Sequence, residues 1–228
     1  MQAASSWDFD LVMFDLDGTL IETAAEISDA VNDTLAQQGL PTVTQGQVER
    51  WIGLGTHELL IQALAYAQHM PQDAVRQSAS LPAVAAEFSR HYAQRCGTRS
   101  RLYPQVREVL QQLRQRQVRL AVVTNKEARY TQTILAAHGL PAWLDRVVSG
   151  DSLPTKKPDP AGIHSCLSQF RVRPERALFV GDSSIDVAAA RRAGVPVWVL
   201  PYGYNMGQPI EDSQPDRVLA DFSMLLKR

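Results

Sequence analysis

The sequence predicts an α/β fold: a parallel sheet covered by helices on both faces and interrupted by a helical insertion. Short apolar runs rich in Val, Leu and Phe alternate with helical patterns along the chain. Such near-continuous apolar runs are typical of strands that are buried on both faces of a parallel sheet. The first two runs are separated by roughly a hundred residues, whereas a simple crossover needs only about a dozen. That interval therefore holds the insertion.

Six segments are expected to form the strands of this sheet. The strong runs cover Leu11–Phe14 and residues 120–123, 177–180 and 197–200, and weaker runs cover residues 147–148 and 218–219. A sheet in which a helix follows most strands is a Rossmann-like core.

The helical patterns divide into two groups. Between the strands they cover about 104–117, about 126–138 with Gly139 as a left-handed stop, and about 185–193 closed by Gly194. In the long interval they cover 24–38 ending at Gly39, 56–70 ending at Pro71, and 82–95 ending at Gly97. We expect residues 1–21 and 96–228 to form the core domain and residues 22–95 a helical cap above the carboxyl ends of the strands, where open parallel sheets bind ligands.

Bulk properties exclude several classes of protein. The chain has 228 residues, of which 45% are hydrophobic and 21% charged, the balance of an ordinary globular domain. A formal net charge of −1 gives no reason to expect a nucleic acid or an anionic membrane as partner. Residues 1–8 show neither a basic start nor an apolar run, so we expect no signal peptide, and no stretch of the sequence is long enough to span a membrane. We expect a cytoplasmic monomer or homodimer.

The two cysteines, Cys96 and Cys166, show neither metal-ligand nor redox spacing. Reduced thiols are the expectation, and one structural disulfide is the alternative.

The first strand runs directly into two acids. Residues two apart on an extended segment face the same way, so Asp15 and Asp17 should project together. Gly18 allows the chain to turn, and Thr19 can form a local hydrogen bond. A strand that ends in an Asx-type turn would explain the same residues, so this motif alone leaves both interpretations open.

Three later segments add polar groups at or after strand ends. Thr124, Asn125 and Lys126 follow the second strong run, and Lys157 precedes a proline in a loop that could simply be solvated. Asp182 and Asp186, one helical turn apart, follow the third run, although a helix N-terminus also favours carboxylates for structural reasons. Each motif is weak by itself; their order at successive strand ends predicts one site.

In that order these motifs resemble those of the haloacid dehalogenase-like phosphohydrolase superfamily. The matching positions are the segment Asp15–Thr19, Thr124, Lys157, and Gly181-Asp182 with Asp186. Further segments resemble the bacterial phosphoglycolate phosphatases within that superfamily; these are residues 51–53, 124–126, 156–158, 202–205 and 213–216. The resemblance implies a phosphatase that hydrolyses a small phosphate monoester, 2-phosphoglycolate above all.

The resemblance also assigns roles. Asp15 would attack phosphorus and form an aspartyl-phosphate, and Asp17 would act as general acid and base. Lys157 would stabilise the charge on the transferring group. Thr124 and the backbone amides of Gly18 and Thr19 would bind its oxygens, with Asn125 and Lys126 as further candidates.

The resemblance also implies a cation. Neighbouring carboxylates at about 4 Å repel each other by roughly 4 kcal/mol at an effective dielectric near 20. Mg²⁺ fits such a cluster because it prefers one or two carboxylates together with phosphate oxygens and water. Asp15 and Asp182 would supply side-chain oxygens, Asp17 its backbone carbonyl, and Asp186 would support the metal or its waters.

The insertion offers one candidate subsite. Gly53 and His57 flank the start of a predicted helix, where free amides could hold a small carboxylate such as that of glycolate. A loop with Thr56 as an ordinary N-cap would explain this segment equally well.

Two other functions remain open at this level, and two more are disfavoured. The same site could serve a phosphatase for another sugar or nucleotide phosphate, or a phosphomutase that transfers the phosphoryl group to a sugar. A dehalogenase is disfavoured because it has no use for an acid at Asp17. A non-catalytic binding protein is disfavoured by the presence of all the motif residues together.

Overall fold

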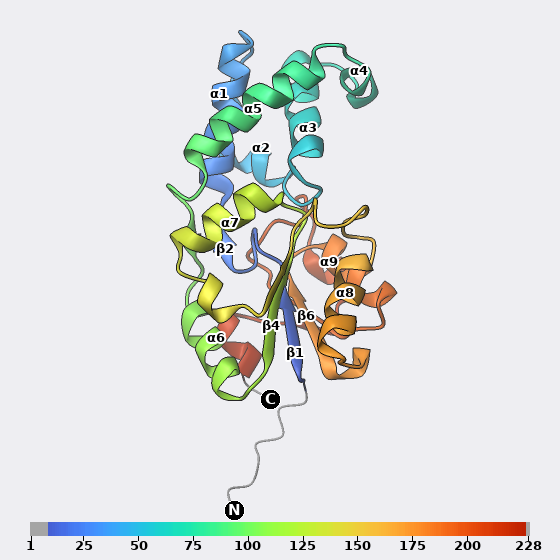
Figure 1. Ribbon diagram of the computed structural model, residues 1–228. Helices are drawn as coiled ribbons and strands as arrows, with labels where there is room; N and C mark the ends of the chain where they lie inside the picture. The colour runs from blue at the N-terminus through green and yellow to red at the C-terminus, as the bar shows by residue number, and fades with distance from the viewer. Residues whose placement is uncertain (1–8, 227–228) are drawn as a thin grey trace, which may run out of the picture.

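A six-stranded parallel sheet forms the centre of the molecule (Figure 1). The computed structural model describes residues 9–226, so the predicted lack of a signal peptide in residues 1–8 lies outside the described residues. The strand order is β5-β4-β1-β6-β7-β8. The strands are β1 (Leu11–Phe14), β4 (Arg119–Val123), β5 (Arg146–Val148), β6 (Ala177–Gly181), β7 (Val197–Val199) and β8 (Arg217–Val218). All six predicted strands are confirmed, and their ends differ from the predicted ones by no more than about one residue.

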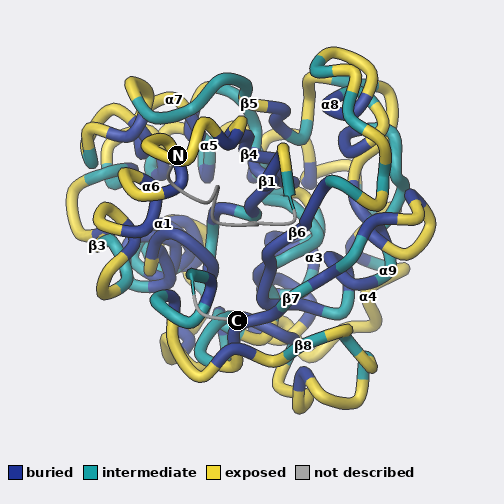
Figure 2. Tube along the Cα trace, turned by 90° about the horizontal axis from the view of Figure 1, so that it is seen from below, coloured by how far each residue is buried: buried dark blue, intermediate teal, exposed yellow. Residues whose placement is uncertain are grey.

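Strand β1 is buried on both faces. Its side chains alternate between the two faces of the sheet, as in any strand. Val12 and Phe14 belong to one cluster of buried apolar side chains, and Leu11 and Met13 belong to another. This is why the strand is a continuous apolar run in the sequence. Seen from below, the buried segments lie toward the middle of the molecule (Figure 2).

Helices cover both faces of the sheet. Helices α6 (Val106–Gln115) and α7 (Ala128–Ala137) lie on one face, and α8 (Ala161–Phe170) and α9 (Ser184–Arg192) lie on the other (Figure 1). Helix α8 is not among the predicted helices, although Ile163, Cys166 and Leu167 follow helical spacing and are buried in it. Short 3₁₀ helices complete this part of the chain within the described residues: η1 (Pro141–Trp143), η2 (Pro174–Arg176), η3 (Ile210–Ser213) and η4 (Phe222–Leu226).

A segment of five helices lies beyond the carboxyl ends of the strands (Figure 1). It contains α1 (Ala24–Gln37), α2 (Gln45–Glu49), α3 (Thr56–Gln68), α4 (Gln72–Arg76) and α5 (Leu81–Arg95). The sequence predicts α1, α3 and α5, while the five-residue helices α2 and α4 are too short to show a period. Helix α3 ends before the predicted residue because His69 adopts a left-handed conformation with φ 55°.

Two short strands join the ends of this helical segment. β2 (Ile21–Glu22) pairs antiparallel with β3 (Arg101–Leu102), so the chain leaves the sheet and returns to it at one place. Two-residue strands have no periodicity, and this pair could not be predicted from the sequence.

Two further expectations concern the cysteines and membranes. Cys96 and Cys166 are both buried and free of disulfides, as predicted. Within residues 9–226, no helix has the length and apolar character needed to cross a membrane.

Candidate active site

The strand order brings three sequence motifs to one edge of the sheet. β1 lies between β4 and β6, so the residues that follow these three strands are neighbours. Asp15 follows β1, Thr124 follows β4 and Asp182 follows β6. All three line a single cavity between the sheet and the helical segment. The convergence of these motifs is thus a consequence of topology.

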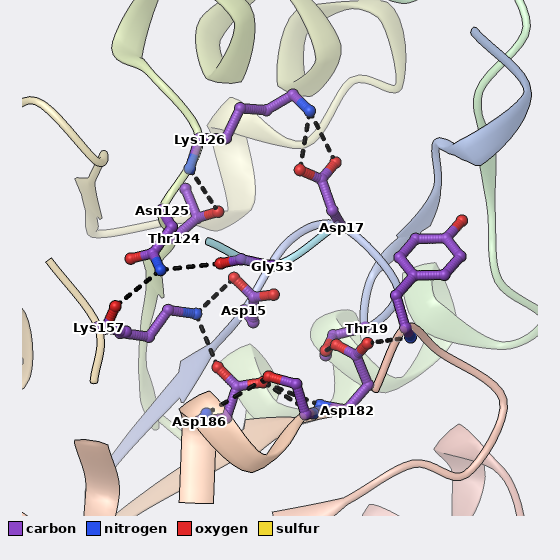
Figure 3. Close-up of polar contacts among 12 residues, drawn as sticks. Asp15, Asp17, Thr19, Gly53, Thr124, Asn125, Lys126, Lys157, Asp182 and Asp186 are labelled. Atoms are coloured by element: carbon purple, nitrogen blue, oxygen red, sulfur yellow. Dashed lines mark hydrogen bonds and ion pairs between the residues drawn. The ribbon is translucent and has the colours of Figure 1, made fainter. Parts of the chain in front are cut away.

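Lys157 forms ion pairs with two of the acids. Its Nζ donates to Oδ1 of Asp15 at 2.6 Å and to Oδ1 of Asp186 at 2.7 Å (Figure 3). Burial by itself would lower the pKa of Lys157, but the two carboxylates outweigh burial and raise it. The ammonium group is therefore held in its charged form.

Asp182 and Asp186 are fixed by donors from several elements. Asp182 accepts hydrogen bonds from the hydroxyl of Thr19 at 2.5 Å and from the backbone N–H of Tyr204 at 2.6 Å. Asp186 accepts from the hydroxyl of Ser183 at 2.7 Å and from two backbone N–H groups at the start of α9. Ser183 is the N-cap residue of α9, so its hydrogen bonds with Asp186 both cap the N-terminus of this helix and orient the carboxylate.

These acids form a cluster that has the composition of a cation site. One oxygen from each of Asp15, Asp182 and Asp186 lies within 4.8 Å of the others. Burial and the neighbouring carboxylates, only partly offset by Lys157, raise the pKa of Asp15 to about 6, and burial and the other acids raise that of Asp182 well above its usual range. Lys157 balances only one of the three charges. The cluster therefore carries unbalanced negative charge in a buried place, which a divalent cation would neutralise.

Asp17 has a different environment from Asp15. Lys126 donates to both oxygens of Asp17, at 2.9 and 2.8 Å, and the hydroxyl of Thr23 donates to Oδ1 at 2.7 Å. Both aspartates line the cavity, but each faces its own lysine (Figure 3). β1 ends at Phe14, so strand periodicity does not extend to the two acids. The repulsion expected between them is relieved by two buried ammonium groups.

The remaining predicted residues of the core fall into two groups. Thr124, Asn125 and Lys126 line the cavity. Gly18 and Thr19 are not among the described residues that line it; they pack behind Asp182 instead. A Cβ on Gly18 would lie 2.3 Å from Oδ2 of Asp182, and its φ is +87°, so glycine is required at this position.

The helical segment supplies the opposite wall. Gly53 lines the cavity, as predicted for the start of α3, whereas the side chain of His57 is exposed. Sequence reasoning missed Thr56 and the apolar residues of the cavity wall; most of them lie on α1, α3 and the loop before α3, and Ile185 lies on α9 in the sheet part of the molecule. The side chains concerned are Ile27, Ile52, Thr56, Leu59 and Ile185. Apolar residues at helical spacing carry no signal that separates a cavity wall from a core.

Comparison with known proteins gives a consistent result. The family model described as haloacid dehalogenase-like hydrolase matches residues 12–200. A phosphoglycolate phosphatase of Haemophilus influenzae (strain 86-028NP) is 39% identical over 218 residues, which cover 96% of this chain and 97% of the relative. A phosphoglycolate phosphatase of Mannheimia succiniciproducens is 40% identical over 221 residues, with the same coverage.

A solved structure shows the same similarity. It is reported as a predicted phosphoglycolate phosphatase from Haemophilus somnus 129pt and superposes with a TM-score of 0.91. It shares 37% sequence identity, and the match covers 96% of this chain and 97% of that chain. The similarity therefore extends over both the sheet and the helical segment.

Proposed function

The chain belongs to the haloacid dehalogenase-like hydrolases, and because its relatives in that family are phosphoglycolate phosphatases, we propose that it hydrolyses 2-phosphoglycolate to glycolate and phosphate. That the chain is a phosphoric monoester hydrolase follows from this membership together with its phosphatase relatives. The observation that carries the proposal is the buried cluster of Asp15, Asp182 and Asp186 with Lys157 at the bottom of one cavity.

The cluster fits Mg²⁺. Its donors are carboxylate oxygens, the ligands that this hard cation prefers, and its unbalanced charge matches a divalent ion. Asp15 and Asp182 would hold the ion with the backbone carbonyl of Asp17, and Asp186 would support it. When bound, Mg²⁺ would neutralise the cluster and polarise the phosphoryl group.

Asp15 is the proposed nucleophile. It follows the central strand β1, and its side chain keeps 13% of its surface exposed toward the cavity, while Lys157 binds only Oδ1. A carboxylate oxygen attacks phosphorus, the bond from phosphorus to the ester oxygen breaks, and an aspartyl-phosphate forms. Attack by water on this phosphorus then releases phosphate and restores Asp15.

Asp17 is the proposed general acid and base. The alkoxide that leaves in the first step needs a proton, and the water that attacks in the second step must lose one. Thr23 and Lys126 both donate to Asp17, which holds the carboxylate as an acceptor, the form that takes the proton from water. Asp17 would return that proton to the next leaving group.

Lys157 and Thr124 are proposed to bind the transferring phosphoryl group. Both are buried at the cavity, with 4% of their surface exposed. The Lys157 ammonium lies against Asp15 and can stabilise the charge that develops on the oxygens of the group. Lys126 adds a second cation on the side of Asp17.

Residues 22–95 are the proposed cap, with residues 1–21 and 96–228 as the core domain. The apolar wall formed by Ile27, Ile52 and Leu59 excludes water from the site, and it leaves room for a small leaving group. The backbone at the start of α3, with Thr56, is the proposed contact for the glycolate carboxylate.

A panel of small phosphate esters tests the proposal. Purified protein with Mg²⁺ should release phosphate faster from 2-phosphoglycolate than from sugar or nucleotide phosphates, and EDTA should abolish the reaction. Faster release from a sugar or nucleotide phosphate would replace the proposed substrate. Interconversion of sugar phosphates without free phosphate would indicate a phosphomutase instead.

A further inference from the structure

The loop that precedes α3, residues 53–56, is attached to the core by side chains from two core loops. It lines the cavity through Gly53, Gly55 and Thr56. The attachments are Asn125 Nδ2 to the carbonyl of Gly53 at 2.9 Å, Lys156 Nζ to the carbonyl of Leu54 at 2.7 Å, and the hydroxyl of Thr56 to Glu127. Each of these three core residues is directly adjacent in sequence to a residue that lines the cavity, namely Thr124, Lys126 or Lys157.

The side-chain amino group of Asn125 donates two hydrogen bonds at the same time. Besides Gly53, its amino group donates to the backbone carbonyl of Lys157 at 2.8 Å (Figure 3). Two carbonyl acceptors fix which end of the amide is the nitrogen, because only the amino end can donate. The group has only two hydrogens, so neither is left for a phosphate oxygen. The side chain is 6% exposed and has no room to turn away.

We propose that Asn125 is a positioning residue, which couples the seating of the loop 53–56 to the placement of Lys157. The carbonyl that Asn125 holds belongs to the residue whose ammonium reaches Asp15 and Asp186. When the loop 53–56 packs against the core, the carbonyl of Gly53 becomes the second acceptor of the Asn125 side-chain amide. The amide, held by both acceptors, then keeps the backbone carbonyl of Lys157 in place. Asn125 thus acts through Lys157 and not by contact with the phosphoryl group.

The close approach that this requires depends on Gly55. A Cβ at this position would lie 2.8 Å from Nζ of Lys156 and 3.2 Å from the backbone oxygen of Asn125. Its φ of +91° also favours glycine. Glycine therefore lets the loop approach both the side chain of Lys156 and the backbone of Asn125.

A pair of variants tests the coupling. Asn125→Asp keeps the size of the side chain but removes both donors. Lys156→Met is the matched control, because it removes the bond to Leu54 at an exposed position and leaves the bond to Lys157 intact. Hydrogen–deuterium exchange of the metal-free full chain is measured on peptides that cover residues 53–59 and 153–164, the second made long because Pro158 and Pro160 carry no amide hydrogen. Kinetics with 2-phosphoglycolate and Mg²⁺ are measured in parallel, and only this kinetic part rests on the proposed function.

We expect Asn125→Asp to increase exchange in both peptides and Lys156→Met to increase it only in 53–59. We also expect Asn125→Asp to lower kcat by roughly tenfold to a hundredfold, the cost of a small misplacement of a catalytic group, whereas Lys156→Met should act on KM alone. If Asn125→Asp does not fold, Asn125→Ser, which keeps one donor, is measured in the same way.

Two results would overturn the inference. Increased exchange confined to residues 53–59 in the Asn125 variant would show that the loop and Lys157 are independent. A lower kcat with unchanged exchange in both peptides would show that Asn125 acts on the substrate directly. A wild-type chain without phosphatase activity would refute the proposed function, yet the exchange comparison would still decide on the coupling.

Discussion

Thr23 and Asp17 are joined by a hydrogen bond of 2.7 Å from the Thr23 hydroxyl to Oδ1 of the acid. Thr23 is the N-cap residue of α1, the first helix of the proposed cap, and its backbone N–H donates to the hydroxyl of Tyr204. The proposed acid and base is therefore tied to the place where the chain leaves the sheet domain. Its position depends on both parts of the molecule.

Thr23→Val should lower kcat without a matching change in KM. The valine keeps the shape of the side chain but removes the donor, and a hydrogen bond to a charged group contributes about 1.5–3 kcal/mol, which corresponds to roughly tenfold or more in rate. Steady-state phosphate release measures the effect. Thr34→Val is the control, because Thr34 is also buried on α1 but donates only to the backbone of Ala30. Equal kcat values for the two variants would contradict the role of Thr23.

Asp15→Asn should abolish phosphatase activity. An amide is a far weaker nucleophile than a carboxylate, and we expect a loss of roughly a thousandfold or more, as for other covalent catalysts. The control is Asp145→Asn, at a carboxylate that pairs with Arg114 and Arg119 away from the cavity. Unchanged phosphate release in Asp15→Asn would show that Asp15 is not the nucleophile. If neither the wild type nor the variant released phosphate while both bound the ester, the chain would be a binding protein on this fold.

The sheet could be predicted from the sequence because its strands are short apolar runs buried on both faces. The same reasoning failed where local pattern and tertiary packing differ. The pair β2–β3 has two residues in each strand, and α2 and α4 have about one turn each, so none shows a period. Helix α8 shows the period, but it directly follows the Pro158–Pro160 stretch, which favours a loop interpretation.

The site could be predicted in part for a related reason. Charged residues at strand ends are visible in the sequence, and the order β4-β1-β6 brings them together. Which partner each acid takes was not predictable, since the pairs Asp15–Lys157 and Asp17–Lys126 span more than a hundred residues. The cavity wall was not predictable either, because Ile27 and Leu59 are ordinary apolar residues on amphipathic helices.

The metal-free protein should become more stable as the pH falls from about 7 toward 5. Burial and neighbouring charges raise the pKa of Asp15 to about 6, above its value in the unfolded chain. Between the two values the folded state binds more protons, so the free energy of unfolding increases as the pH falls through 6. Mg²⁺ should raise the Tm more at pH 7 than at pH 5, because protonated carboxylates bind metals poorly. The two increases in Tm should differ by on the order of 5 °C.

Thermal unfolding with EDTA and with Mg²⁺ at pH 5, 6 and 7 measures this effect. Other groups titrate in the same range, so each value is compared with that of Asp182→Asn, which removes one acid of the cluster. The difference in Tm between the two proteins should shrink as the pH falls. A difference in Tm that is constant with pH would refute the raised pKa of the cluster, and Mg²⁺ stabilisation that is equal at pH 5 and 7 would refute its assignment as the cation site.

Gly203→Ala should weaken Mg²⁺ binding while the fold is retained. A Cβ on Gly203 would lie 2.2 Å from Oδ2 and 2.4 Å from Cγ of Asp182, so the acid would have to move away from its donors Thr19 and Tyr204. Displacement of a ligand or of its supporting bonds typically costs about tenfold to a hundredfold in metal affinity. Calorimetric titration with Mg²⁺ alone measures the effect, independently of turnover. Gly46→Ala on α2 is the control, because nothing lies within 4 Å of the added carbon. Equal affinities in the two variants would show that Asp182 does not bind the ion.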